Sequence, residues 1–292
     1  MTPRGEAGPG RVLITGGTGN TGRRVASRLA ELGVQVRTAS RAAPPPGSAG
    51  EHARFDWADA STHAPALEGV GGVYLVAPAL VDDPSTLMLP FVELALARGV
   101  RRLVLLSSSA IPDGAPGLGA VERFLRERAP GWAALKPSWF MQNFIDRRLP
   151  HGGSLIREGT VVTATGAGRV GFVDADDIAE VAVRALADDA SHDAAHVITG
   201  PEALGYADVA AILARISGRP MRHLEVDDAE ARRRLMEAGV PAHYAALLVR
   251  LDAAIREGAE DRVTDTVARV TGRAPRSFEA FARAHAGVFR GA

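Results

Sequence analysis

A glycine-rich turn between an apolar strand and an amphipathic helix constrains the fold of this chain more than any other feature. Residues 15–22 read TGGTGNTG; they follow an apolar run at 12–15 and open a helical stretch at 21–32. In dinucleotide-binding folds the first glycine permits the tight bend, the second lets backbone amides approach a pyrophosphate, and the third lets helix and strand pack closely. The helix N-terminus adds partial positive charge. Cofactor contacts are predicted for Gly16, Thr18, Gly19, Asn20, Thr21 and Gly22; the alternative is a glycine-rich turn that binds nothing.

Short apolar runs alternate with longer amphipathic stretches over the first half of the chain. This rhythm is typical of a parallel sheet covered by helices, and runs such as LVLL at 103–106 suit strands buried on both faces. Strands are predicted at 12–15, 34–39, 72–76, 103–107 and 132–135. Helices are predicted at 21–32, 61–67, 84–98 and 119–128, and the Pro-rich run at 44–47 is predicted as a surface loop. The fold class is therefore α/β, a Rossmann doubly wound parallel sheet.

The pattern changes after Pro137. Residues 138–172 combine aromatic residues with glycines, and the helix predicted at 174–186 starts under acidic residues that suit the helix dipole. A strand is predicted at 196–199, and helices at 206–216, 227–238, 242–256 and 277–285. These elements predict a smaller, mostly helical C-terminal lobe.

Composition excludes several function classes. The 292 residues are 46% hydrophobic and include no cysteine, so the chain can bury a sizeable core and has no thiol chemistry. With 34 basic and 34 acidic side chains it lacks the excess of cations that nucleic acid requires. No apolar run approaches the length of about 20 residues that spans a bilayer. We expect a cytoplasmic protein with a small-molecule partner, no nucleic acid and no membrane; the sequence leaves its oligomeric state open.

The end of the second predicted strand indicates which nicotinamide cofactor is bound. An NAD site usually places a carboxylate there to accept hydrogen bonds from the ribose, but this chain reads Ala39-Ser40-Arg41. An arginine can pair with a 2′-phosphate instead, so Ser40 and Arg41 predict NADP(H), the alternative being a solvated surface arginine. Asp56 is predicted to lie near the adenine amino group or else to cap a helix.

Four further segments accompany the glycine turn. They are SSS at 107–109, KPSWFMQNF at 136–144, FVDADDIA at 172–179 and TGPEAL at 199–204. Together they resemble the atypical short-chain dehydrogenases of the NmrA-like family, from about residue 11 to about residue 226. The chain looks most similar to the branch with the ergot-alkaloid iminium reductases and the NADPH-dependent quinone and triphenylmethane-dye reductases.

This resemblance implies bound NADP(H) and a cleft between the sheet and the C-terminal lobe. It places Val76, Ala77, Pro78, Lys136, Pro137 and Ser138 along the cofactor, the last two near the nicotinamide. It places Trp139, Phe140, Asn143 and Phe144 against the substrate, although an aromatic cluster at this spacing equally fits plain core. We expect residues 1–10 to be a flexible tail, 11–138 with about 174–199 to be the NADP-binding Rossmann domain, and 139–173 with 200–292 to be the substrate lobe.

A single lysine limits the chemistry. Orthodox short-chain dehydrogenases use a Tyr-x-x-x-Lys pair, in which the lysine lowers the tyrosine pKa so that the phenol protonates a carbonyl oxygen. Lys136 is the chain's one lysine, and the position four residues before it is Trp132. After the 107–109 serines the matching positions are Leu118 and Glu122. The Tyr-Lys mechanism is therefore excluded.

Two routes remain for an enzyme of this kind. Hydride can pass to an acceptor that needs little acid help, such as an iminium, a quinone or an activated enone. Alternatively a proton comes from Asp113, from water, or from the candidates for catalysis Ser108, Ser109 and Glu122, although serines at a strand end often cap the next turn. His192 and His196 are predicted to be solvated, and no metal site is expected.

The sequence thus predicts an NADPH-dependent reductase of a small conjugated or aromatic acceptor, in secondary metabolism. Two alternatives stay open. One is a non-catalytic, NADP-sensing NmrA-like regulator, and the other is a redox-neutral cyclase or isomerase on the same fold.

Overall fold

The computed structural model describes residues 10–290, so the predicted tail lies outside the described residues except for Gly10. The chain divides into two compact units. The first, which we call the sheet unit, comprises residues up to 137 together with 175–197. The second unit comprises residues 138–174 and those from 198 onward.

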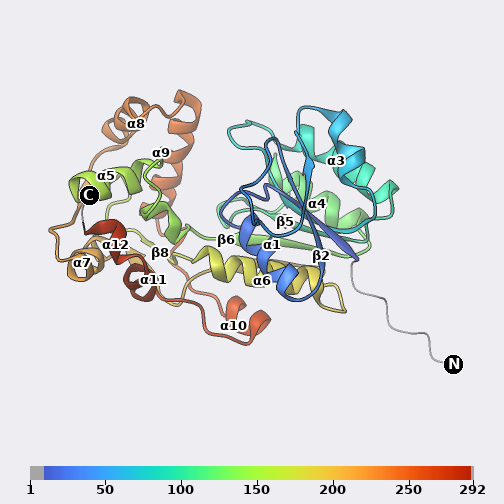
Figure 1. Cartoon of the computed structure of the whole chain (residues 1–292). Coiled ribbons are helices and arrows are strands. Elements are labelled where there is room, and N and C mark those ends of the chain that lie inside the picture. The colour runs from blue at the N-terminus through green and yellow to red at the C-terminus, as the bar shows by residue number, and fades with distance from the viewer. Residues whose placement is uncertain (1–9, 291–292) are drawn as a thin grey trace. The chain divides into compact units, whose positions relative to one another are not determined.

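The sheet unit is built on seven strands in the order β3-β2-β1-β4-β5-β6-β9 (Figure 1). The pairings from β3 through β6 are all parallel. The chain order reverses at β1, and in open parallel sheets ligands bind beyond the carboxyl ends of the strands at such a point. The strands are β1 (Arg11–Thr15), β2 (Gln35–Ser40), β3 (Glu51–Arg54), β4 (Val70–Val76), β5 (Arg102–Leu106), β6 (Trp132–Pro137) and β9 (Ala194–Ile198).

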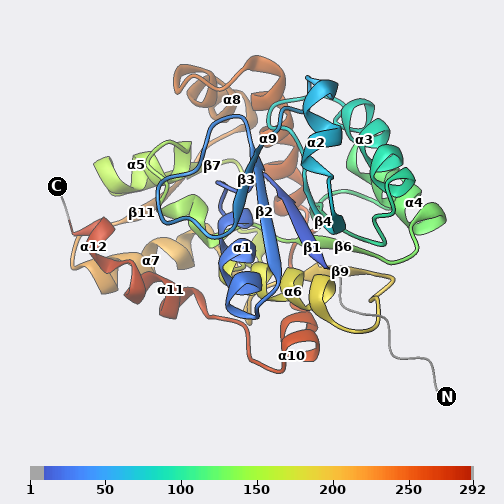
Figure 2. The ribbon, with the colours of Figure 1, turned by 45° about the vertical axis from the view of Figure 1, so that its right-hand side comes forward.

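Helices cover both faces of this sheet. One face carries α1 against α6, and the other carries α3 against α4 (Figures 1 and 2). The central strands are apolar on both sides because both faces are buried; Leu103 and Leu105 pack under Phe91 of α3, while Val104 is equally inaccessible on the opposite face. The helices are α1 (Gly22–Glu31), η1 (Ala60–Thr62), α2 (His63–Ala66), α3 (Ser85–Ala97), α4 (Leu118–Arg128) and α6 (Ala175–Ala187).

The second unit is mostly helical and has its own core. Phe144, Phe172, Tyr206 and Phe278 are fully buried in it and stack edge-to-face or tilted. Two small sheets pair β7 (Thr160–Thr163) with β11 (Arg222–Glu225) and β8 (Arg169–Val170) with β10 (Leu204–Gly205). The helices are η2 (Met141–Phe144), α5 (Pro150–Glu158), α7 (Tyr206–Ser217), α8 (Asp228–Glu237), α9 (Ala242–Arg256), α10 (Thr266–Thr271), α11 (Phe278–Ala284) and α12 (Ala286–Phe289), with α8 against α9 (Figure 2).

The predicted Rossmann α/β class is confirmed, and every predicted strand is present within two residues of its expected ends. The predicted proline-rich loop is also confirmed, since residues 41–50 form no helix or strand. The helix predicted at 61–67 is instead a 3-10 turn followed by one short helix, because the chain must turn at Gly69, whose φ is +69°, to enter β4. Among residues 10–290, none of the helices combines the length and apolarity needed to cross a membrane.

Candidate functional site

The glycine turn joins β1 to α1, and two of its glycines, Gly16 and Gly22, stand where a larger residue would be strained or would clash. Gly16 has a φ of +63°, and its carbonyl accepts a 2.8 Å hydrogen bond from the amide of Gly19. A Cβ on Gly22 would lie 2.3 Å from that same carbonyl oxygen. A Cβ on Gly19 would meet that oxygen at 3.1 Å and no other heavy atom within 4 Å, so its far side is open. The turn therefore has the tight bend and the close helix packing that a dinucleotide loop requires.

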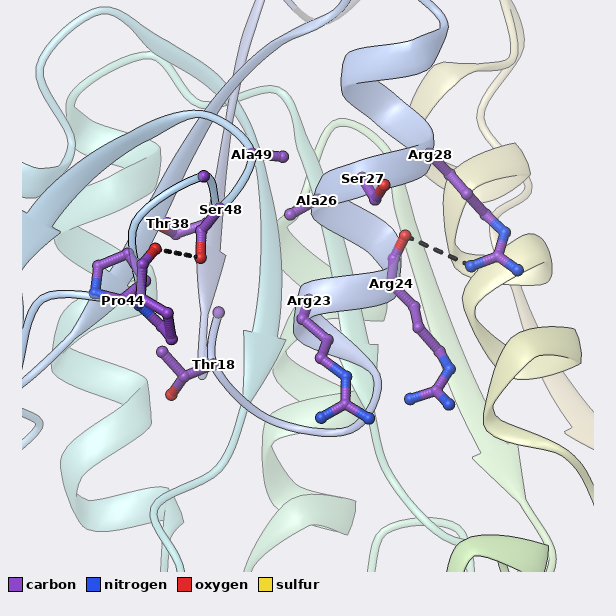
Figure 3. A pocket seen from close by; sticks show the side chains of 13 residues that line it. Thr18, Arg23, Arg24, Ala26, Ser27, Arg28, Thr38, Pro44, Ser48 and Ala49 are labelled. Atoms are coloured by element: carbon purple, nitrogen blue, oxygen red, sulfur yellow. Dashed lines mark hydrogen bonds between the residues drawn. The ribbon is translucent and has the colours of Figure 1, made fainter. Parts of the chain in front are cut away.

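A pocket of about 500 Å³ lies against this turn. One wall is the outer face of α1, and the opposite wall is the loop after β2, where Ser48 Oγ donates a hydrogen bond of 2.8 Å to the carbonyl of Pro45 (Figure 3). Side chains of Arg23, Arg24 and Arg28 project from α1 (Figure 3). The lining residues are Gly17, Thr18, Arg23, Arg24, Ala26, Ser27, Arg28, Thr38, Pro44, Pro45, Gly47, Ser48 and Ala49.

Two of these three arginines are already compensated. Arg28 binds Asp176 at 2.6 Å and Glu180 at 3.1 Å, both on α6, and Arg24 Nε lies 3.2 Å from the same Asp176. Burial lowers the pKa of Arg28, but the hydrogen bond and charge of Asp176, with help from Glu180, raise it above its ordinary value. These ion pairs connect α1 to α6. Because the acidic partners neutralise the positive charge of Arg24 and Arg28, these two arginines would attract an anionic ligand only weakly.

Arg23 and Arg41 are different. Both are exposed, and neither guanidinium makes an ion pair or side-chain hydrogen bond with any of residues 10–290. Arg41 follows the last residue of β2, as predicted, and Arg23 is the second residue of α1. Arg23 was not among the predicted residues, although its place directly after the third glycine of the turn is visible in the sequence. Two uncompensated guanidinium groups can pair with phosphate oxygens.

The other predicted residues near the end of β2 serve the local backbone. Ser40 Oγ donates a hydrogen bond of 2.6 Å to the carbonyl of Ala42. Asp56 Oδ1 accepts from the amide of Ala58 at 3.0 Å. The capping alternative for Asp56 is wrong, because the helical turn that follows is capped by Asp59, which accepts from the amide of Ser61.

The end of β4 is held beside the glycine turn. Thr15 Oγ1 donates to the carbonyl of Tyr74 at 3.1 Å and accepts from the amide of Val76 at 2.7 Å. A Cβ on Gly16 would lie 3.1 Å from that of Val76, so the predicted Val76 and Gly16 are neighbours. Ala77 and Pro78 follow, half-buried, beyond the end of the strand.

Three polar side chains are buried together at the ends of β5 and β6, and the sequence predicted two of them as site residues. Lys136 Nζ lies 3.3 Å from Glu122 Oε2, and the two side chains are 10% and 2% exposed. Ser107 Oγ is buried and has no hydrogen-bond partner among residues 10–290. Its neighbours Ser108 and Ser109 were predicted as site residues and Ser107 was not. What distinguishes Ser107 is its burial without a hydrogen-bond partner, which only the folded structure reveals. An orphaned buried hydroxyl at a strand end is suited to a bound ligand.

Three of the predicted proton donors, Ser108, Asp113 and Glu122, differ in the groups that they contact. Ser108 Oγ accepts a hydrogen bond of 3.2 Å from the amide of Ala110, so the turn-capping alternative describes it. Asp113 receives bonds of 2.5 and 3.0 Å from Arg126, whose hydrogen bonding holds the pKa of Asp113 below its ordinary value. Asp113 is thus an anion at neutral pH and a poor acid. Glu122 is committed to Lys136.

The predicted substrate residues belong to the second unit. Trp139, Phe140 and Asn143 are half-buried. Phe144 is 1% exposed, with ring centroids of Phe172 and Phe278 at 5.2 and 5.3 Å, so plain core packing accounts for it. The predicted cofactor contact Ser138 is also in this unit; its buried Oγ donates to Glu260 Oε2 at 3.4 Å.

The prediction that His192 and His196 are solvated is wrong. His196 is 4% exposed, its Nε2 lies 3.0 Å from His192 Nδ1, and His192 Nε2 lies 3.1 Å from Asp188 Oδ2. The reason is that β9 joins the sheet beside β6, which covers alternate side chains of the strand. Residues 10–290 contain no group of three or more His, Asp or Glu side chains placed to hold a metal ion.

Taken together, the residues of the sheet unit fit a dinucleotide. The glycine turn provides backbone amides at a helix N-terminus, Arg23 and Arg41 provide uncompensated cations, and Ser107 provides an unpartnered buried hydroxyl. These features all lie at or beside the carboxyl edge of the sheet.

Comparison with known proteins agrees with this assignment. Residues 16–189 match a family model described as NAD(P)H-binding. The uncharacterised oxidoreductase YesF of Bacillus subtilis strain 168 is 49% identical over 275 residues, which cover 94% of this chain and 95% of that protein. Agroclavine dehydrogenase of Claviceps fusiformis is 36% identical over 277 residues, covering 92% of this chain and 95% of that protein.

A solved structure shares the fold. The triphenylmethane reductase of Citrobacter sp., complexed with NADP(H), matches with a TM-score of 0.80 and 20% identity, covering 94% of this chain and 99% of that one. At this identity the likeness concerns the architecture alone.

Proposed function

The chain belongs to the NAD(P)H-binding family whose model it matches, and from this premise we propose that it is an NADPH-dependent reductase of a small conjugated or aromatic acceptor. The observation that carries the proposal is the pocket beside the glycine turn, with the uncompensated Arg23 on its wall. A nicotinamide cofactor supplies a hydride when bound. The residues of the chain bind it, orient it and select the acceptor.

The preference for NADP(H) over NAD(H) follows from charge. The end of β2 carries Arg41 where an NAD site would carry a carboxylate, and Arg41 and Arg23 have no acidic partner among residues 10–290. Arginine forks match the geometry of phosphate oxygens. A 2′-phosphate would therefore gain ion pairs that an unsubstituted ribose cannot make.

The proposed class of acceptor follows from the lack of a side chain suited to protonate a carbonyl oxygen. Lys136 has no tyrosine four residues before it, Asp113 is held ionised by Arg126, and Glu122 is occupied by Lys136. An iminium, an activated enone or a quinone accepts hydride without strong protonation of a carbonyl oxygen. The name of one relative, agroclavine dehydrogenase, agrees with such redox chemistry and supports the proposed place in secondary metabolism.

Turnover with a panel of acceptors tests this function. Purified protein is mixed with NADPH and, separately, with an iminium, an enone, a quinone and a cationic triphenylmethane dye, and the loss of NADPH absorbance is followed against product formed. We expect at least one acceptor to be reduced in a one-to-one ratio with NADPH oxidised, and NADH to be a poorer donor. Cofactor binding without any turnover would instead identify a sensor, and product without cofactor a redox-neutral enzyme.

A further inference from the structure

A buried ion pair ties α4 to β6 at the carboxyl edge of the sheet. Lys136 reaches from β6 to Glu122 in the second turn of α4, with 3.3 Å between Nζ and Oε2. Both side chains are at least nine-tenths buried. Burying two charges is costly unless the pair gains further hydrogen bonds, so the position needs an explanation beyond the pair itself.

Ser107 belongs to the same face of the sheet. β5 and β6 are parallel with Leu105 opposite Ala134, and the amide of Ser107 donates to the carbonyl of Leu135 at 2.7 Å, so Ser107 stands next to Lys136 in register. Side chains alternate along a strand, and Leu105 and Ala134 both pack in the core that α3 and α4 cover. Ser107 and Lys136 therefore project on the face where Glu122 lies.

This group of three has unused hydrogen-bonding capacity. An ammonium has three donors, and within residues 10–290 the ion pair of Lys136 is with Glu122, which can occupy only part of that capacity. Within residues 10–290, Ser107 Oγ has no hydrogen-bond partner, whereas Glu122 Oε2 has its ion pair with Lys136 and no further hydrogen bond. Orphaned buried polar atoms are uncommon and costly, so the arrangement is suited to a ligand that brings oxygen atoms to this edge.

The group lies at a definite distance from the glycine turn. Between β1 and β6 stand β4 and β5, and neighbouring strands lie about 4.8 Å apart, so the two ends of the edge are roughly 14 Å apart. A dinucleotide whose pyrophosphate rests on the glycine turn extends across such an edge. Its adenosine half lies toward β2 and its nicotinamide half toward β5 and β6.

Resting on the proposed function, we propose that Lys136 and Ser107 donate hydrogen bonds to oxygen atoms of the nicotinamide riboside, and that Glu122 is the positioning residue that aims Lys136. Lys136 is a residue of β6 and Glu122 is a residue of α4. The cation is therefore supplied from the strand, and the helix supplies its counter-ion. Because the pair is neutral as a whole, it recognises uncharged hydroxyl or amide oxygens rather than a phosphate.

Binding of cofactor fragments tests this inference. Dissociation constants for NADPH and for 2′,5′-ADP, which carries the adenosine half alone, are measured by calorimetry on the wild type and on Lys136→Met/Glu122→Gln, which removes both charges together. Glu122→Gln tests positioning alone, and Lys136→Arg keeps a cation. The matched control is Arg37→Met/Glu51→Gln, which removes an ion pair of 3.2 Å on β2 and β3 in the same sheet. Thermal unfolding reports the stability of each variant.

We expect the Kd of NADPH to rise about tenfold to a hundredfold in Lys136→Met/Glu122→Gln while that of 2′,5′-ADP stays within about twofold. Glu122→Gln should show a smaller rise of the same kind, Lys136→Arg should retain more affinity, and the control should lose thermal stability without this selective effect. Unchanged NADPH affinity, or an equal rise for both ligands, overturns the inference. Wild-type protein that binds neither ligand overturns the proposed function instead.

Discussion

The two ends of the carboxyl edge of the sheet handle positive charge in opposite ways. Beside β1 and β2, the guanidinium groups of Arg23 and Arg41 are exposed and have no counter-ion among residues 10–290. Beside β5 and β6, the single lysine is buried and faces Glu122 at 3.3 Å. One end presents net charge to solvent, whereas the other keeps a buried pair of opposite charges.

This difference matches two kinds of recognition. A phosphate brings its own charge, so exposed arginines that are not yet paired gain most from binding it. A nicotinamide riboside is recognised through neutral oxygens, and a fixed donor is worth more there than a mobile charge because hydride transfer depends on orientation. We infer that one end selects the cofactor and the other aligns it.

The largest expected effect is on stability at the lysine end. Lys136→Met alone leaves Glu122 as an unpaired buried carboxylate, and breaking a buried pair in this way costs about 3–5 kcal/mol. Urea unfolding of Lys136→Met and of Arg41→Met makes the comparison directly. The midpoint should fall sharply for the first and stay unchanged for the second; equal midpoints would show that the two ends do not differ as described.

The glycine turn after β1 should be nearly as sensitive. In Gly22→Ala the new Cβ would lie 2.3 Å from the carbonyl oxygen of Gly16, and overpacking of this kind costs about 1–3 kcal/mol. We expect NADPH affinity to fall by more than about tenfold because the turn must shift. Gly33→Ala is the matched control, since Gly33 has a φ of +77° and no atom within 4 Å of its Cβ position; it should lose stability and keep its affinity.

Smaller effects are expected at the arginine end, and they should separate the two cofactors. Arg23→Met and Arg41→Met should each raise the Kd of NADPH about fivefold to tenfold, with little change for NADH, because each loses a charge-assisted contact to the 2′-phosphate. Arg28→Met removes an arginine that already binds Asp176 and Glu180. It should therefore change the ratio of the Kd of NADPH to the Kd of NADH less than Arg23→Met or Arg41→Met does. A larger change of this ratio in Arg28→Met would contradict the assignment.

Ionic strength should have the smallest effect on cofactor affinity, and it should act only at the end of the edge where Arg23 and Arg41 are exposed. Raising salt from about 0.01 M to about 0.15 M shortens the screening length from about 30 Å to about 8 Å. Titrations at both salt concentrations should show NADPH binding weakened several-fold and NADH binding nearly unchanged. A similar loss for both cofactors would mean that the exposed arginines do not read the 2′-phosphate.

The sequence predicted those parts of the fold that local pattern determines. Apolar runs bounded by glycines placed the central strands, and TGGTGNTG placed the turn into α1. β3 was missed because its sequence, EHAR, is polar, as a short strand away from the centre of the sheet can be. α5 was missed because two glycines interrupt its pattern, and it starts at Pro150 and ends at the left-handed Gly159.

The candidate site was predictable only where function depends on residue type. Arg41 was visible because a missing carboxylate is a property of the sequence. The freedom of Arg23, the orphaned hydroxyl of Ser107 and the contact between Lys136 and Glu122 depend on what surrounds each side chain. Such neighbours come from other strands and helices, and no local pattern records them.

Transfer of deuterium from labelled cofactor tests directly whether the protein passes a hydride from NADPH to its acceptor. NADPH carrying deuterium at C4 of the nicotinamide, on one face or the other, is incubated with the protein and an iminium or enone acceptor, and the product is analysed by mass spectrometry and NMR. We expect one deuterium on the acceptor carbon, delivered from one face of the cofactor alone. Product without deuterium from either labelled cofactor, or product formed without cofactor, would contradict it.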